Sequence, residues 1–106
     1  MKWFFVGWML LCSAVAMAGR PQFEIEIKNN MFYPDRIVVP AGTKVRLIVH
    51  NRDDKPEEFE SFELNREKVI AGNSTTAIFV GPLAPGEYPF FGEFNLETAQ
   101  GMIIAE

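Results

Sequence analysis

Carboxylate side chains are concentrated in one short segment of this 106-residue chain. Carboxylate oxygens are hard ligands, and sites rich in oxygen suit harder cations such as Fe²⁺ or Mn²⁺ better than thiolate sites do. Binding of a divalent metal ion is therefore the first chemistry that the sequence suggests. The six acids of the segment are Asp53, Asp54, Glu57, Glu58, Glu60 and Glu63.

The alternation of side chains predicts which of these acids face the interior. Phe62 and Leu64 are apolar and two residues apart, so we expect them to share a buried face, and Glu58 and Glu60 have the same parity. In a regular strand both acids would point inward, where a lone carboxylate is costly unless hydrogen-bond donors or a cation stabilise it. A bulge near Pro56 would reverse this assignment, because one extra residue turns every side chain to the other face.

Two interpretations of the acidic segment remain open. In the first, Glu57, Glu58 or Glu60 meets Glu93 at one end of the domain and binds a metal ion, with Met31 as a possible softer ligand. In the second, the acids form a solvated loop and an edge strand, where charge discourages aggregation, and Met31 is an ordinary packing residue. Which of Glu57 and Glu58 points inward depends on loop geometry.

The remaining polar candidates have simpler explanations. His50, the single histidine, has the opposite parity to Val45, Leu47 and Val49, so we expect it at the surface. Asn95 is either an amide ligand or the cap of a helical turn at residues 96–100. Asp53 and Asp54 are expected to make turn hydrogen bonds, and Met102 is expected in the core.

Residues 1–18 have the features of a cleaved signal peptide. Lys2 is followed by an apolar run, residues 3–16, that is shorter than the ~20 residues needed to span a bilayer. Ala16-Met17-Ala18 then forms a small-x-small cleavage site. We expect export to the periplasm and a mature domain of residues 19–106. Cleavage would remove Cys12, the single thiol, so we expect neither a disulfide partner nor a thiolate ligand.

The mature chain has the length of one small acidic domain. Without Lys2 it carries nine basic and fourteen acidic residues, a net charge of −5. This charge argues against nucleic acid and against anionic membrane surfaces, since both attract basic proteins.

The pattern of apolar residues predicts an all-β fold. Period-two alternation is interrupted by Gly and Pro at short intervals, which is typical of antiparallel strands. We expect seven to eight short strands packed as a β-sandwich. The expected strands include residues 23–27, 37–39, 45–50, 75–80, 88–91 and 101–105.

The order of these signals resembles the cupredoxin family, whose fold is a Greek-key β-sandwich. Residues 30–43, NMFYPDRIVVPAGT, resemble that family's first hairpin, and residues 45–51, VRLIVHN, resemble the strand leading to its first metal ligand. Residues 85–88, PGEY, resemble the turn before its ligand loop, and residues 101–104, GMII, resemble its closing strand. The resemblance extends over the whole mature chain.

The resemblance also implies how this chain departs from a blue-copper site. Gly92 lies where the family's cysteine is expected, Asn95 where a histidine is expected, and Glu57 or Glu58 near the place of the first histidine. A blue-copper centre uses two His and one Cys, usually with an axial Met. We therefore predict no blue-copper centre.

A closer resemblance involves iron. Residues 56–67, PEEFESFELNRE, and 86–94, GEYPFFGEF, are similar to small periplasmic cupredoxin-like proteins of bacterial ferrous-iron uptake. That resemblance implies a copper or iron ion as cofactor or cargo. It also implies two partners, a periplasmic iron-binding protein and an inner-membrane iron permease.

The leading hypothesis is an exported metal-binding protein that assists ferrous-iron uptake, by oxidising Fe²⁺ as an accessory ferroxidase or by delivering it to a permease. One alternative is a metal-free interaction domain with an exposed aromatic patch. The other is a copper carrier that uses Met and Glu ligands. The residues of the expected patch are Tyr88, Phe90, Phe91 and Phe94.

Overall fold

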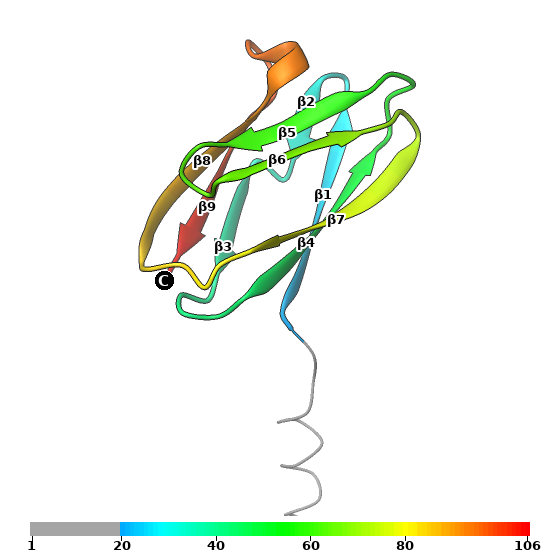
Figure 1. Cartoon of the computed structure of the whole chain (residues 1–106). Coiled ribbons are helices and arrows are strands. Elements are labelled where there is room, and N and C mark those ends of the chain that lie inside the picture. Colours follow the sequence, from blue (N-terminus) through cyan, green and yellow to red (C-terminus); the bar gives the residue numbers. More distant parts are fainter. Residues whose placement is uncertain (1–19) are drawn as a thin grey trace, which may run out of the picture.

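The computed structural model describes residues 20–106, which form a sandwich of two β-sheets (Figure 1). The expected signal peptide, residues 1–18, and Cys12 lie outside the described residues. Within residues 20–106 the only helix is one 3-10 turn, η1, and no helix is long and apolar enough to cross a membrane.

The all-β prediction is confirmed, with nine strands in place of the expected seven to eight. One sheet has the order β2-β1-β4-β7 and the other has the order β3-β9-β8-β5-β6. The bounds of the elements are β1 Gln22–Lys28, β2 Met31–Tyr33, β3 Arg36–Val39, β4 Val45–Asn51, β5 Glu57–Ser61, β6 Arg66–Ile70, β7 Ser74–Val80, β8 Gly86–Gly92, η1 Glu93–Asn95 and β9 Gln100–Ala105.

Alternation along the strands places one face of each sheet in the core. In β4, Val45, Leu47 and Val49 are fully buried while the residues between them are exposed or half-buried, as the period-two pattern predicts. Strand β1 runs parallel to β4, with Ile25 opposite Val49. β3 likewise runs parallel to β9, so the first and last described strands are held inside their sheets by long-range pairing.

Three phenylalanines connect the sheets through the core. Phe59 and Phe90, from neighbouring strands of the five-stranded sheet, stack with ring centroids 4.9 Å apart. Phe32, from the four-stranded sheet, lies edge-on to Phe90 at 4.9 Å. Offset stacks and edge-to-face pairs are the favoured arrangements of aromatic rings. This cluster lies beneath the part of β5 that carries the acidic residues.

Strand β6 was not predicted, since four of its five residues are exposed and they show no alternation of apolar side chains. β6 is an edge strand that pairs only with β5, in an antiparallel register from Glu57↔Ile70 to Ser61↔Arg66. Its sequence therefore lacks the hydrophobic period from which a buried strand is recognised.

Candidate functional site

Glu57, and not Glu58, points into the protein. The side chains of Glu57, Phe59 and Ser61 are buried, whereas Glu58 and Glu60 lie half-buried on the outer face of β5. The expected inward orientation of Glu58 and Glu60 was therefore wrong.

The physical reason is the end of the strand. β5 stops at Ser61, and residues 62–65 form a turn, closed by a hydrogen bond from the Asn65 N–H to the Phe62 carbonyl. Leu64 reaches the core from this turn, while Phe62 is 73% exposed. Parity counted back from Leu64 therefore crosses a turn, where the period-two rule no longer applies.

Hydrogen-bond donors satisfy the buried Glu57 carboxylate, which is 1% exposed. Its Oε1 accepts bonds from the backbone N–H of Glu58 and that of Phe94, both at 2.9 Å. Its Oε2 accepts a bond of 2.7 Å from the side-chain Nδ2 of Asn95. Donation to a buried carboxylate is what allows it to remain in an apolar environment. The carboxylate thus joins β5 to the η1 turn.

This contact decides the role of Asn95. Its side chain bonds Glu57, and no side chain caps η1. The helical turn that follows begins from the Asn95 backbone carbonyl, which accepts bonds from the N–H groups of Thr98 and Ala99. The side-chain cap, one of the two alternatives for Asn95, is therefore not formed, because the amide donates to Glu57.

Gly92 completes this inner position by leaving room for the carboxylate. A Cβ on Gly92 would lie 2.6 Å from both Cδ and Oε2 of Glu57, and 2.6 Å from the Cβ of Ala99. These separations are far inside van der Waals contact, so a side chain at residue 92 and the present position of Glu57 exclude each other.

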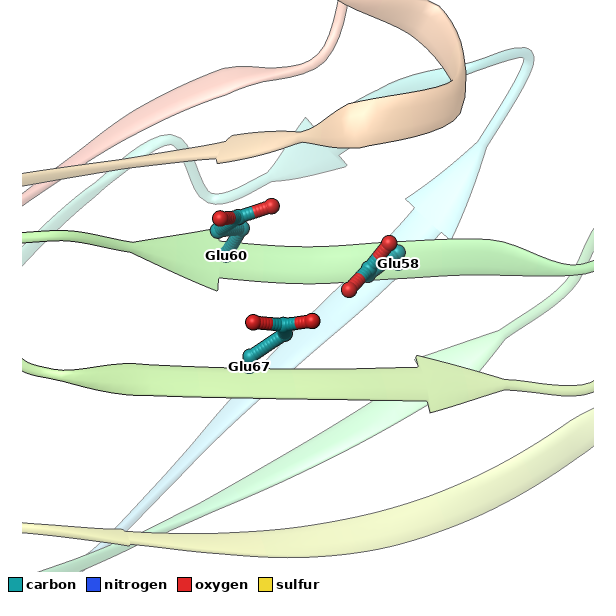
Figure 2. Close-up of side chains that lie close together, drawn as sticks. All are labelled: Glu58, Glu60 and Glu67. Atoms are coloured by element: carbon teal, nitrogen blue, oxygen red, sulfur yellow. The ribbon is translucent and has the colours of Figure 1, made fainter.

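On the outer face of the same sheet, three carboxylates converge. Figure 2 shows Glu58 and Glu60 on β5 and Glu67 on the neighbouring β6, with their carboxylates close together on one face. Each offers one oxygen, and these oxygens lie within 4.8 Å of one another. Glu60 and Glu67 are direct cross-strand partners. We call Glu58, Glu60 and Glu67 the outer acidic cluster.

Mutual repulsion and partial desolvation change the acidity of the cluster. A hydrogen bond shared with Glu67 raises the pKa of Glu58, and partial burial and the charges of Glu67, Glu60 and Glu93 raise it further. Partial burial raises the pKa of Glu60, together with the charges of Glu67 and Glu93 and a hydrogen bond with Glu93. Glu93 is therefore close enough to the cluster to affect the pKa values of Glu58 and Glu60.

Basic side chains near the cluster in sequence are directed elsewhere. The two salt bridges found within residues 20–106 are Arg52–Glu26 and His50–Glu24, and neither involves the cluster. Arg66 donates from its Nε to the carbonyl of Phe79 on β7. Lys68 is paired with the inward-facing Phe59, so it lies on the opposite face of β6 from Glu67.

The other candidates lie apart from both positions. Met31 is on β2, in the other sheet, where its Sδ accepts a bond of 3.7 Å from the Tyr33 hydroxyl. His50 lies on the outer face of the four-stranded sheet, as expected, with Nε2 2.8 Å from Glu24 and Nδ1 2.9 Å from Thr75.

Three further expectations have mixed outcomes. Asp53 accepts hydrogen bonds from the N–H groups of Asn29 and Asn30 in the β1–β2 turn. Its carboxylate therefore joins two turns, whereas bonds within their own turn were expected of Asp53 and Asp54. Met102 is half-buried and lies beside a surface groove, not in the core. The expected aromatic patch was wrong in two members, because Phe90 is buried in the Phe32–Phe59 cluster and Tyr88 is half-buried against the core.

Glu67 was missed by sequence reasoning. It lies outside the acidic segment, and its place beside Glu60 follows from a hairpin whose second strand has no apolar alternation. Sequence spacing alone could have identified Glu67, since an antiparallel hairpin with its turn at residues 62–65 places residue 67 opposite residue 60.

The comparisons with known proteins agree with this sandwich. The model of the cupredoxin-like domain family matches residues 2–105. The chain belongs to that family. An uncharacterized protein of Rickettsia prowazekii (strain Madrid E) is 48% identical over 83 residues, which is 78% of this chain and 66% of that protein, slightly under two thirds of its length.

Solved structures of copper proteins share the fold at low sequence identity. Auracyanin A, a blue copper protein of Chloroflexus aurantiacus, superposes with a TM-score of 0.72 at 15% identity, over 83% of this chain and 100% of that one. The metal-binding domain of the Cu(I)-exporting ATPase CopA of Streptococcus pneumoniae D39 gives a TM-score of 0.69 at 15% identity, over 80% and 84%. At such identities the likeness concerns the fold alone.

The residues of the inner position do not fit a blue-copper ion. Such an ion requires a thiolate and two imidazoles, whereas residue 92 is glycine and His50 is hydrogen-bonded to Glu24 on the other sheet. Both oxygens of Glu57 already accept hydrogen bonds. The Glu57 carboxylate and the Asn95 amide at this position are therefore satisfied by hydrogen bonds within the chain itself.

Proposed function

We propose that this cupredoxin-like protein is exported to the periplasm, binds Fe²⁺ as cargo at the outer acidic cluster and assists ferrous-iron uptake. The observation that carries the proposal is the convergence of three carboxylate oxygens within 4.8 Å, with no basic side chain paired to them in residues 20–106. Oxygen ligands suit Fe²⁺ and Mn²⁺. The similarity of residues 56–67 and 86–94 to proteins of ferrous-iron uptake supports iron as the physiological ion.

The raised pKa values of Glu58 and Glu60 support the same assignment. The hydrogen bond with Glu67 at Glu58 and partial desolvation at Glu60 raise the two pKa values first, and the neighbouring like charges raise them further. A divalent cation would remove the repulsion between the carboxylates. This relief would contribute to the free energy of metal binding, because the carboxylates are already close together. Glu93 extends the cluster from the start of η1.

In this proposal the chain holds the ion and presents it to an iron permease, whether the ion passes on as Fe²⁺ or after oxidation. The cluster is on an outer sheet face, where a permease or a periplasmic iron-binding protein can reach it. Glu57 has a structural role here, since it positions Phe94 and Asn95 next to Glu93.

The test is calorimetric titration of the protein, expressed from the full-length gene, with Fe²⁺ under anaerobic conditions, Mn²⁺ and Cu²⁺. The informative variant is Glu58→Gln/Glu60→Gln/Glu67→Gln, and the charge-matched control is Glu63→Gln/Glu87→Gln/Glu97→Gln. We expect saturable binding, weakened roughly tenfold or more in the cluster variant (about 1.4 kcal/mol) and little changed in the control. Equal weakening in both variants, or no binding by the wild type, would contradict the proposal.

A metal-free interaction domain is the second candidate, and the closed inner position favours it. The Glu57–Asn95 bond and the close fit of Gly92 stabilise this end of the sandwich with the chain's own groups. For this function we expect an unchanged melting temperature when Mn²⁺ or Fe²⁺ is added. A ligand that binds the native state at 100 times its Kd raises the stability by about 2.7 kcal/mol, so the two candidates give different melting curves.

The copper-carrier alternative depends on Met31, which is 36% exposed and lies in the other sheet from the outer acidic cluster. For a carrier that uses this thioether, Met31→Leu would reduce Cu⁺ affinity. If copper has no role at Met31, the Cu⁺ affinity stays the same, because leucine preserves the packing volume.

A further inference from the structure

An apolar groove adjoins the outer acidic cluster on the same face of the five-stranded sheet. The groove has a volume of about 400 Å³ and is formed by β8, β9 and the turn after η1. Pro89 and Met102 are cross-strand partners at its floor, and Leu96, 51% exposed, lies at its rim.

The groove and the acidic cluster are continuous. Phe91 lines the groove and is the cross-strand partner of Glu60. On the other side of Phe91, Phe62 packs edge-on at 5.5 Å between ring centroids, and it is 73% exposed. An exposed apolar surface beside a group of charges is typical of an interaction site.

We propose that this face docks a basic amphipathic segment of a partner protein, with an apolar side chain in the groove and Lys or Arg side chains against Glu58, Glu60 and Glu67. Charge complementarity carries the assignment. Opposite potentials across an interface accelerate encounter and select the correct partner. Within residues 20–106 the acids of the cluster have no salt-bridge partner.

Two other occupants fit the charges less well. In a symmetric dimer built on this face, the same patch would meet itself, which would bring two acidic clusters together. An anionic membrane would be repelled by the same carboxylates. Arg66 lines a surface pocket with Glu60 and Glu67, but its guanidinium donates hydrogen bonds to the carbonyls of Phe79 and Asn65. Arg36, the cross-strand partner of Met102, lies on the β9 side of the groove.

The repulsion within the cluster also favours a cationic partner. Glu58, Glu60 and Glu67 each offer a carboxylate oxygen within 4.8 Å of the other two. A guanidinium or ammonium group would stabilise the ionised forms, and Arg in particular can bond two carboxylate oxygens at once.

The experiment is a selection from a random 12-residue peptide library on the purified protein, expressed from the full-length gene, in the presence of EDTA. The chelator makes the outcome independent of the proposed metal site. We expect the selected peptides to share an aromatic or aliphatic residue flanked by Lys or Arg. Acidic peptides, peptides without shared chemistry, or no enrichment would overturn the proposal.

Affinities of one selected peptide then locate the site. Leu96→Asp should weaken binding tenfold or more, and Glu58→Gln/Glu60→Gln/Glu67→Gln should weaken it and flatten its dependence on salt. The matched control is Tyr33→Asp, since Tyr33 has similar exposure, 47%, but lies in the other sheet. The control should change affinity less than twofold, and equal effects of Leu96→Asp and Tyr33→Asp would overturn the assignment.

Sedimentation of the wild type and vesicle binding test the other occupants. A dimer that Leu96→Asp dissociates would identify a second copy as the occupant. Binding to phosphatidylglycerol vesicles that Leu96→Asp abolishes would identify a membrane. Either result would overturn the proposal.

Discussion

At the inner position, three hydrogen-bond donors satisfy a buried carboxylate. The two oxygens of Glu57 accept hydrogen bonds from two backbone N–H groups and from the Asn95 amide, and Gly92 leaves the space that the carboxylate occupies. Loss of one donor to a buried charged group is costly, because the group has already lost its hydration. Stability at this end of the sandwich therefore depends on a few specific atoms.

Asn95→Ala removes the amide donor to Glu57. We expect the free energy of unfolding to fall by about 1–3 kcal/mol, since Oε2 would lose its hydrogen-bond partner. Urea denaturation at neutral pH measures the change. Glu97→Ala, an exposed substitution in the same loop, should remain within about 0.5 kcal/mol of the wild type. Equal stabilities of the two variants would show that the Glu57–Asn95 bond contributes nothing.

Gly92→Ala places a methyl group against Glu57 and Ala99. We expect a loss of about 1–3 kcal/mol from overpacking. In the double variant Gly92→Ala/Ala99→Gly, removal of the Ala99 methyl relieves part of the overlap. The double variant should therefore lose less stability than the sum of the losses in Gly92→Ala and Ala99→Gly, with a coupling of at least about 0.5 kcal/mol. Thermal or urea denaturation of the four proteins completes the cycle, and strict additivity would contradict the predicted contact.

At the scale of the elements, β5 separates two environments. Its inner residues Glu57, Phe59 and Ser61 are buried, and its outer residues Glu58 and Glu60 join Glu67 of β6. Like charges directly opposite each other in a sheet are destabilising. The β5–β6 hairpin therefore carries a local electrostatic cost that a bound cation would remove.

The pH dependence of stability follows from the raised pKa values of Glu58 and Glu60. Below their ordinary pKa of 4.5 both groups are protonated in the folded and unfolded states. The stability that comes from tighter proton binding by the folded state is then fully present. As the pH rises from 4.5 through the raised pKa values, the unfolded state releases its protons first, so this contribution is lost.

Glu58→Gln/Glu60→Gln should therefore lose less stability than the wild type between pH 4.5 and neutral pH. At pH 7 we expect the variant to melt at a higher temperature, and the difference should narrow at pH 4. Melting temperatures across this range, without divalent ions, test the prediction. Glu63→Gln/Glu97→Gln is the control, and a parallel shift of all three curves would contradict a specific effect of the cluster.

At the scale of the molecule, the core and the proposed binding face belong to the same sheet. Phe59 and Phe90 pack inward against Phe32, while their strands present Glu60 and Phe91 outward. The rigid core thus holds the acidic cluster and the groove in fixed relation.

Phe32→Ala would remove the ring that the four-stranded sheet contributes to this cluster. We expect a loss of about 3–5 kcal/mol in the free energy of unfolding, because the core cannot fully close over the cavity. Phe94→Ala is the control, since Phe94 is 51% exposed. Urea denaturation with two probes, far-ultraviolet circular dichroism and aromatic fluorescence, should show one coincident transition. A small effect of Phe32→Ala would indicate that the sheets are held together elsewhere.

The two proposals also make a joint prediction. Because Mn²⁺ and a basic peptide would use the same carboxylates, each should weaken the binding of the other by the same factor. Peptide titrations with and without Mn²⁺ measure this coupling. Independent binding would mean that at least one of the ligands does not use the cluster.

Hydrophobic periodicity is a local property, so it was enough to predict the all-β class and the strands with one buried face, such as β1 and β4. The correspondence of residues 92 and 95 to copper-ligand positions is what the resemblance to cupredoxins implies. Three features could be seen only in the folded protein: Glu57 is the inward acid, Asn95 bonds to it, and Glu67 completes the outer cluster. These facts depend on where β5 ends and on which residues the β5–β6 hairpin brings opposite each other. A strand end shifts parity, and an exposed edge strand has no hydrophobic period to reveal it.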